Sequence, residues 1–163
     1  MSDASVDRPR AAPGTYALLL RAGAEQTLEV GALGEMRVRP GVYVYVGSAF
    51  GPGGVRARVR RHARADGARH WHVDYLRAVT TLEAVWYTHD PTRRECVWAA
   101  AMRDMADASV PLGGFGASDC DCPAHLAAVP SAPSVAAFRD RVRDACPDHA
   151  ALGRVAGATL VED

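Results

Sequence analysis

The sequence has no long apolar segment and little cysteine. No stretch of its 163 residues approaches the ~20 consecutive apolar residues that a transmembrane helix needs, and its first residues lack the apolar core of a signal peptide. Its four cysteines, at positions 96, 120, 122 and 146, are too few for a disulfide framework. These absences predict a reduced, cytoplasmic protein that does not contact membranes.

Lysine is also absent, and 19 basic residues balance 19 acidic residues to a net charge of zero. The total charge therefore does not indicate a nucleic-acid partner. The distribution is uneven, however, because the segment 51–70 holds six arginines and one aspartate. A basic stripe in a neutral protein is typical of phosphate contacts, although a solvated helix face has the same composition.

The apolar pattern favours one mixed domain of the α/β (α+β) class with an antiparallel sheet. The pattern predicts strands over residues 16–21, 42–46 and 82–88, a hairpin over 27–30 and 35–38, glycine-rich loops over 47–54 and 110–118, and helices over 55–65, 91–106 and 134–145. We divide the chain into a flexible tail (1–13), a main domain (14–126) and a C-terminal helical extension (127–163).

The first predicted helix directs a charged residue toward the core. At ~100° per residue, Arg58 and His62 fall on the same side as Val55 and Val59. A guanidinium on this side needs an acidic partner or a cleft, because an unpaired buried charge is costly. The residue therefore either forms a salt bridge or clamps a phosphate, to which arginine binds bidentately.

The second long helix repeats this anomaly with the opposite charge. Glu95 lies within an apolar stripe formed by Trp98, Ala99, Met102, Met105 and Ala106. One explanation is a capping box over residues 92–95, although Asp90 and Pro91 offer another helix start. The other is a metal ion bound by Glu95 beside a phosphate held by Arg58. Carboxylate ligation of this kind suits Mg²⁺ or Mn²⁺.

Several short motifs, taken together, resemble one known family. Gly14-Thr15-Tyr16 and Tyr45-Val46-Gly47 are similar to the two signatures that name the GIY-YIG nucleases, and the segment 58–62 and Glu95 stand where that family has its arginine, histidine and glutamate. The segments 40–54, 70–76 and 114–120 resemble most its Uri-like branch.

The resemblance implies a small three-stranded antiparallel sheet flanked by helices, here with an extra hairpin and a C-terminal helix. It also implies endonuclease hydrolysis of DNA phosphodiester bonds with one divalent ion, in repair or on branched or single-stranded DNA. Tyr16 or Tyr45 would act as the general base, Arg58 would stabilise the phosphate, and Glu95 would bind the metal. His62 and His72 would support proton transfer or positioning. The expected DNA contacts are Gly47, Ser48, Arg56, Arg60, Arg61 and Arg64.

Some features depart from the family pattern or lie outside it. The chain has no asparagine to match the family's late one, for which Ser118 or Asp119 is the nearest substitute. Cys120, Cys122 and His125 could form a structural zinc site completed by His70 or His72, with buried free thiols as the alternative. Three tryptophans are expected in the core: Trp71, Trp86 and Trp98. The alternative functions are a nucleic-acid-binding module of the same fold that does not cleave, and a protein-interaction module.

Overall fold

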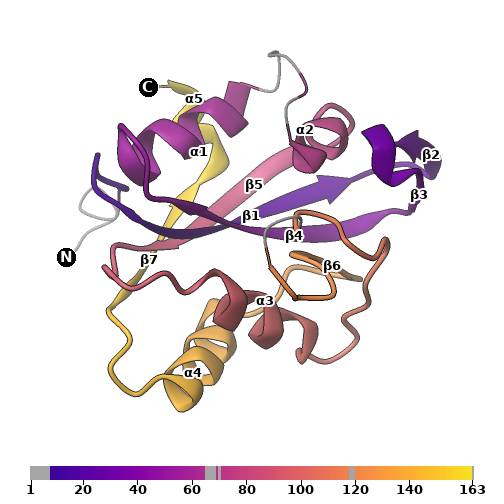
Figure 1. Ribbon diagram of the computed structural model, residues 1–163. Coiled ribbons are helices and arrows are strands. Elements are labelled where there is room, and N and C mark those ends of the chain that lie inside the picture. The colour runs from indigo at the N-terminus through magenta and orange to yellow at the C-terminus, as the bar shows by residue number, and fades with distance from the viewer. Residues whose placement is uncertain (1–7, 65–68, 70, 118–119, 163) are drawn as a thin grey trace.

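The computed structural model describes residues 8–64, 69, 71–117 and 120–162, which form a main antiparallel sheet with helices on both faces and a separate two-stranded sheet (Figure 1). The sheet has five strands in the order β6-β4-β1-β5-β7. Their bounds are β1 (Gly14–Ala22), β4 (Gly41–Ala49), β5 (Thr81–Thr88), β6 (Leu126–Val129) and β7 (Leu152–Ala156). The α+β class is therefore confirmed.

The three central strands are those that the apolar pattern predicts, but the prediction of a three-stranded sheet is wrong. β1 pairs with β4 and β5 along almost its whole length. β6 and β7 add an edge strand at each side, and both come largely from the predicted C-terminal extension. The division at residue 126 falls at the start of β6 and does not mark a boundary in the sheet.

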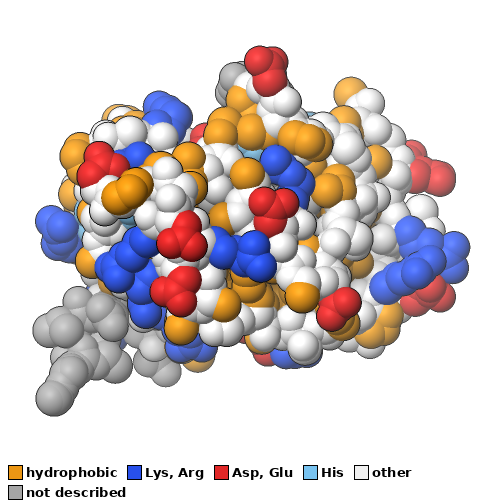
Figure 2. All heavy atoms as spheres, turned by 90° about the horizontal axis from the view of Figure 1, so that it is seen from below, with side chains coloured by type: hydrophobic (Ala, Val, Ile, Leu, Met, Phe, Trp, Pro, Cys, Tyr) orange, Lys and Arg blue, Asp and Glu red, His pale blue; other side chains and the backbone are white. Residues whose placement is uncertain are grey.

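Alternating side chains of the central strands pack into two apolar layers. Leu18 and Leu20 of β1 face α1 (Gly54–Arg64), α2 (His72–Arg77) and α5 (Gly157–Glu162). Ala17 and Leu19 face the opposite way, toward α3 (Glu95–Arg103) and α4 (Val135–Ala145). Figure 1 shows these two groups of helices on opposite sides of the sheet. On the surface seen in Figure 2, acidic and basic side chains are intermingled.

The predicted hairpin is confirmed, whereas the predicted 47–54 loop is only partly correct. The hairpin consists of β2 (Gln26–Glu29) and β3 (Glu35–Val38), joined by the 3₁₀ turn η2 (Gly31–Leu33). β4 continues through Ala49, and α1 begins at Gly54. Gly54 has a φ of 61°, and a Cβ there would lie 2.3 Å from the carbonyl oxygen of Ala12. Glycine thus allows the N-terminal segment to pass close to the helix start.

The N-terminal segment is tied to the domain by hydrogen bonds from Arg10 onward. The amides of Val55 and Arg56 donate to the carbonyl oxygens of Ala12 and Arg10. His89 accepts from the amide of Arg10 and contacts the carbonyl of Pro13 at 3.0 Å. Residues 1–7 of the predicted tail lie outside the described residues. Among the described helices, none has the length and apolar character to cross a membrane.

The outer edge of β4 is covered along only half of its length. β6 pairs with Val42 to Tyr45, and its chain then turns away. Beyond that point the amide of Val46 donates to the carbonyl of His125, which precedes β6. The short edge strand therefore leaves the end of β4 open to groups from both faces of the sheet.

Candidate active site

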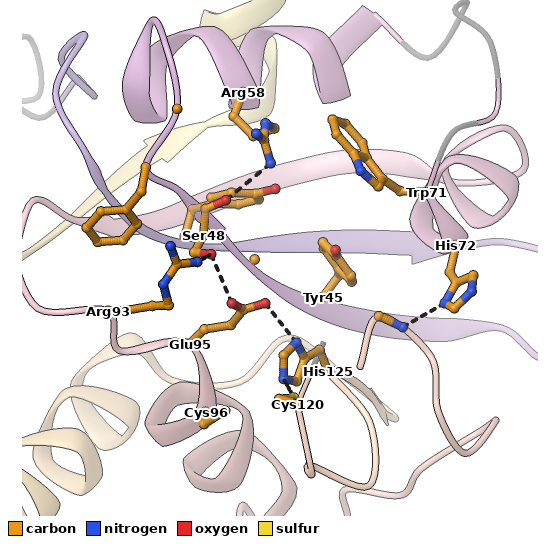
Figure 3. A pocket seen from close by; sticks show the side chains of 15 residues that line it. Tyr45, Ser48, Arg58, Trp71, His72, Arg93, Glu95, Cys96, Cys120 and His125 are labelled. Carbon is orange, nitrogen blue, oxygen red and sulfur yellow. Dashed lines mark hydrogen bonds and ion pairs between the residues drawn. The ribbon is translucent and has the colours of Figure 1, made fainter. Parts of the chain in front are cut away.

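A cleft of about 730 Å³ lies at this open end of β4. Figure 3 shows Arg58 and Trp71 reaching it from the α1 side, and Arg93, Glu95 and His125 from the α3 side. Of the residues predicted for a site, those lining the cleft are Tyr16, Tyr45, Gly47, Ser48, Arg58, His72 and Glu95. The structure thus brings together side chains that lie up to 79 positions apart in the sequence.

Tyr16 and His62 form a buried pair below the cleft. The Tyr16 hydroxyl lies 2.9 Å from Nε2 of His62, and both side chains are buried. Gly47 makes room for the phenol ring, because a Cβ there would lie 2.6 Å from the Tyr16 hydroxyl. The glycine of the Tyr45-Val46-Gly47 motif therefore has a packing role against the tyrosine of the first motif.

Burial makes these groups hard to ionise. It raises the pKa of Tyr16 strongly, against the opposing charge of Arg58. The pKa of Tyr45 also rises well above its usual value, mainly through burial. Burial lowers the pKa of His62 to about 3. Both phenols and the imidazole are therefore neutral near pH 7. A tyrosine that acts as a general base needs a lowered pKa, whereas the pKa of both tyrosines is raised.

Arg58 faces the cleft and makes no ion pair within the described residues. One guanidinium nitrogen donates to the carbonyl of Ser48 at 3.2 Å, and the guanidinium carbon lies 4.6 Å from the centre of the Trp71 ring. The salt-bridge explanation of this inward arginine is therefore not supported. Arg61 differs, because it forms a bidentate ion pair with Asp74 at 2.9 and 3.0 Å.

Glu95 is the first residue of α3, and its carboxylate is held from two sides. Oε1 accepts from the Ser48 hydroxyl at 2.9 Å, and Oε2 lies 2.9 Å from Nδ1 of His125. Burial alone would raise the pKa of Glu95, but the contacts with His125 and Ser48 and the charge of Arg93 lower it below its usual value. Glu95 is therefore ionised near pH 7.

The predicted helix over 91–106 begins too early and ends too late, because α3 spans Glu95–Arg103. The capping-box explanation of Glu95 is wrong, since the amide of Thr92 donates to Asp90 Oδ1 instead. Asp90 is not the N-cap of α3. Its carboxylate organises the turn before the helix and leaves Glu95 free to face the cleft.

Ser48 connects the two charged sides of the cleft. Its hydroxyl donates to Glu95 and accepts from Arg93 at 2.8 Å, and its carbonyl accepts from Arg58. Arg93 also lies over the ring of Phe50, 4.7 Å from its centre. Sequence reasoning missed Arg93 and Phe50, for which no local signal exists, because each is defined by a contact across 43 to 45 residues.

The structure places the other predicted residues at different distances from the cleft or does not describe them. Nδ1 of His72 accepts from the amide of Gly116 at 2.8 Å, so the other ring nitrogen carries its proton. Trp71 is 37% exposed, and its assignment to the core is wrong; Trp86 and Trp98 are in the core. Arg56, Arg60, Arg61 and Arg64 are outside the cleft lining. His70, Ser118 and Asp119 are outside the described residues.

A second group of potential ligands adjoins the cleft on the α3 side. The ligand atoms of Cys96, Cys120, Cys122 and His125 all lie within 4.8 Å of one another, and this Cys/His cluster could hold a metal ion. Among the described residues the fourth member is Cys96, not the predicted His72. All three cysteines are free thiols, and burial is the main cause of the raised pKa of Cys120 and Cys122. In the sequence, only the position of Cys96 next to Glu95 could have indicated that it belongs to this cluster.

Comparison with known proteins gives one match. The model of a family described as Domain of unknown function DUF123 matches residues 15–146. No curated protein and no solved structure matches significantly. The matched region contains the three central strands except Gly14 of β1, and also β6, the whole cleft and the Cys/His cluster. Because the match covers most of its length, the chain belongs to the DUF123 family.

Proposed function

We propose that this protein is a divalent-metal-dependent endonuclease that hydrolyses DNA phosphodiester bonds, as its GIY-YIG-like motifs imply. The observation that carries the proposal is the placement of Arg58 and Glu95. These two charges come from helices on opposite faces of the sheet, yet both line one cleft and both bind Ser48 rather than each other. A phosphate and its counter-ion would fit between opposite charges that are kept apart in this way.

The side chains on each side would do different work. Arg58 would bind the scissile phosphate, and Arg93 would add positive charge beside it. Glu95 is ionised, and each of its oxygens retains a second lone pair beyond its contact with Ser48 or His125, so it suits Mg²⁺ or Mn²⁺. Such an ion, when bound, would stabilise negative charge on the phosphate oxygens. The thiols of the Cys/His cluster favour a softer ion, for which we propose zinc.

Aromatic rings in the cleft lining favour a substrate with unpaired bases. Trp71 lines the cleft, and the guanidinium carbons of Arg58 and Arg61 lie 4.6 and 4.0 Å from its ring centre. Phe50 also lines the cleft, with Arg93 4.7 Å from its ring centre. Bases of single strands stack on aromatic rings, and arginine beside the ring adds phosphate binding. Branched or single-stranded DNA is therefore the substrate class that we favour over intact duplex.

A second candidate function is a nucleic-acid-binding module of the same fold that does not cleave. The observation that favours it is the raised pKa of Tyr16 and Tyr45, because a phenol that stays protonated cannot act as a general base. In the enzyme, the attacking water would then lose its proton to another acceptor or to a tyrosine whose pKa falls when the substrate is bound.

Cleavage of supercoiled plasmid and of flap and forked oligonucleotides, with Mg²⁺ or Mn²⁺, distinguishes the two candidates. Arg58→Ala should reduce cleavage by about 100-fold, as expected when a donor to developing charge is lost. Arg141→Ala is the control and should leave cleavage unchanged, because Arg141 is exposed on α4, lies outside the cleft and is not among the predicted DNA contacts. DNA binding without cleavage by the unmodified protein on every substrate would favour the binding module.

A further inference from the structure

His125 lies between the Cys/His cluster and the carboxylate of Glu95. Its Nε2 is 3.2 Å from Sγ of Cys120, and its Nδ1 is 2.9 Å from Oε2 of Glu95. The ring is buried, so water does not compete for either nitrogen. Figure 3 shows the ring joined to Cys120 on one side and to Glu95 on the other. One side chain thus touches both groups of potential metal ligands.

The Cys/His cluster has the composition and spacing of a closed zinc site. Three thiols and one imidazole make a complete tetrahedral set of soft ligands. With Zn–S bonds of ~2.3 Å, tetrahedral ligand atoms stand about 3.8 Å apart, so ligand atoms already within 4.8 Å need only a small contraction. Four protein ligands leave no open position, which indicates a structural ion and not a catalytic one.

An ion at this place would act on Glu95 by two routes. A metal on Nε2 of His125 requires the ring proton to sit on Nδ1, which then donates to Glu95. Without an ion the proton can instead sit on Nε2 beside Cys120, and the lone pair of Nδ1 would face the carboxylate. Cys96 follows Glu95 on the first turn of α3, so its ligation would also fix the backbone that carries Glu95.

We propose that Cys96, Cys120, Cys122 and His125 bind one Zn²⁺ ion, and that His125 then positions the Glu95 carboxylate for the catalytic ion. His125 is a positioning residue, since it acts through Glu95. The second half of this proposal rests on the proposed function, because it needs a divalent ion at Glu95. The first half stands independently of it.

Cobalt binding to the full-length protein tests the zinc site. One equivalent of Co²⁺ should produce the thiolate charge-transfer and tetrahedral d–d absorption bands, and Zn²⁺ should remove them by displacement. Cys122→Ser should weaken or abolish these bands. Cys146→Ser is the matched control and should leave them intact, because Cys146 is the one cysteine outside the cluster. Absence of the bands in the unmodified protein, or an unchanged spectrum in Cys122→Ser, would overturn the assignment.

The coupling is tested with His125→Cys, which offers zinc a fourth thiolate but removes the contact with Glu95. We expect this variant to retain one zinc ion and to bind Mn²⁺ at Glu95 about 10- to 100-fold more weakly, measured by electron paramagnetic resonance. A second measurement uses the unmodified chain, in which chelation of zinc should weaken Mn²⁺ binding and added zinc should restore it.

Two outcomes separate the possible failures. Unchanged Mn²⁺ affinity in zinc-loaded His125→Cys and in the zinc-depleted protein would overturn the coupling but not the zinc site. Failure of the unmodified, zinc-loaded protein to bind Mn²⁺ would overturn the proposed role of Glu95, and the coupling with it. The cobalt spectrum would still decide the zinc site in that case.

Discussion

Two neighbouring residues at the start of α3 serve two different charged clusters. Arg94 points into a buried network, where it donates to Asp90 at 3.1 Å and to Asp148 at 3.4 Å. Glu95 points into the cleft, where the nearest guanidinium groups bind Ser48 instead of its carboxylate. In the first cluster opposite charges neutralise each other, whereas in the second they are held apart.

The difference shows which charges are available to a ligand. Asp90 also accepts from the amides of Thr92 and Ala150, so its carboxylate is fully used by the fold. Burial would raise the pKa of Asp90, but these hydrogen bonds and Arg94 lower it. The Asp90–Arg94 pair therefore stabilises the fold, and Arg58 and Glu95 are the pair that a substrate or an ion can complete.

Replacing Glu95 should affect function and leave stability nearly unchanged. Loss of a metal ligand removes several kcal/mol of transition-state stabilisation, and ~4 kcal/mol corresponds to about a thousandfold in rate. We therefore expect Glu95→Gln to reduce the rate of metal-dependent cleavage about a thousandfold. Urea denaturation should show a change in the free energy of unfolding below ~1 kcal/mol. A large loss of stability would mean that Glu95 belongs to the fold, as Asp90 does.

Replacing Asp90 should have the reverse effect. Asp90→Ala would leave Arg94 without its buried partner and two amides without their acceptor, at a cost of about 3 kcal/mol in the free energy of unfolding. Asp148→Ala is the control, because Asp148 contacts the same arginine but its side chain is 85% exposed. Its loss should cost less than ~1 kcal/mol. Equal effects in the two variants would contradict the assignment of Asp90 as the structural partner.

Acid should destabilise the two regions over different pH ranges. The folded-state pKa of His62 is about 3 and its ordinary value is 6.5, so below pH 6.5 the unfolded chain binds a proton that the folded chain does not. Stability should fall by about 1.4 kcal/mol per pH unit through this window. Asp90 has a lowered pKa, so its contribution is complete above its ordinary value of 3.8 and is lost only at lower pH.

Unfolding measured from pH 7 to pH 4 in the parent and in His62→Gln isolates the first effect. The substitution should remove the part of the pH dependence of the free energy of unfolding that comes from His62. The stabilisation that Asp90 provides should be unchanged. Parallel pH profiles for the two proteins would mean that His62 is protonated in the folded state as easily as in the unfolded state.

The smallest predicted effect concerns the aromatic side of the cleft. Trp71→Ala should weaken binding of a single-stranded oligonucleotide by about tenfold, which corresponds to ~1.4 kcal/mol, at the lower end for one stacked base. Binding of intact duplex should change much less, and Trp71→Phe should recover part of the loss. Fluorescence anisotropy at fixed salt measures both. An equal loss for duplex would favour a role of Trp71 in supporting Arg58.

Local patterns were enough to predict the centre of the sheet but not its edges. The three central strands are rich in apolar and β-branched residues, which mark a buried strand. β6 (Leu126–Val129) has two alanines, and β7 (Leu152–Ala156) contains Gly153 and Arg154. These edge strands form because they pair with the backbone of β4 and β5, and the residues of the edge strands themselves do not reveal that pairing. α2, with six residues, is too short for a helical period to emerge.

Apart from the residues that the family resemblance supplied, the candidate site was predictable only where a charge conflicts with an apolar pattern. Arg58 and Glu95 were found because each stands on an otherwise apolar helix face. Cys96 and His125 come together only after β6 has paired with β4, and because they are 29 positions apart no local pattern shows their relation. Trp71 was misplaced because the size of a tryptophan suggests a core position, whereas its two arginine neighbours keep it at the cleft.

The last strand also bears on how far the protein can be shortened. The family match ends at Cys146, and β7 lies beyond it. A protein trimmed to that point would leave the backbone of Ala84 to Thr88 without a partner along one edge, and the amide of Ala150 would no longer bind Asp90. An exposed edge of this kind pairs readily with another copy. Trimming should therefore promote self-association, even though every residue of the cleft is retained.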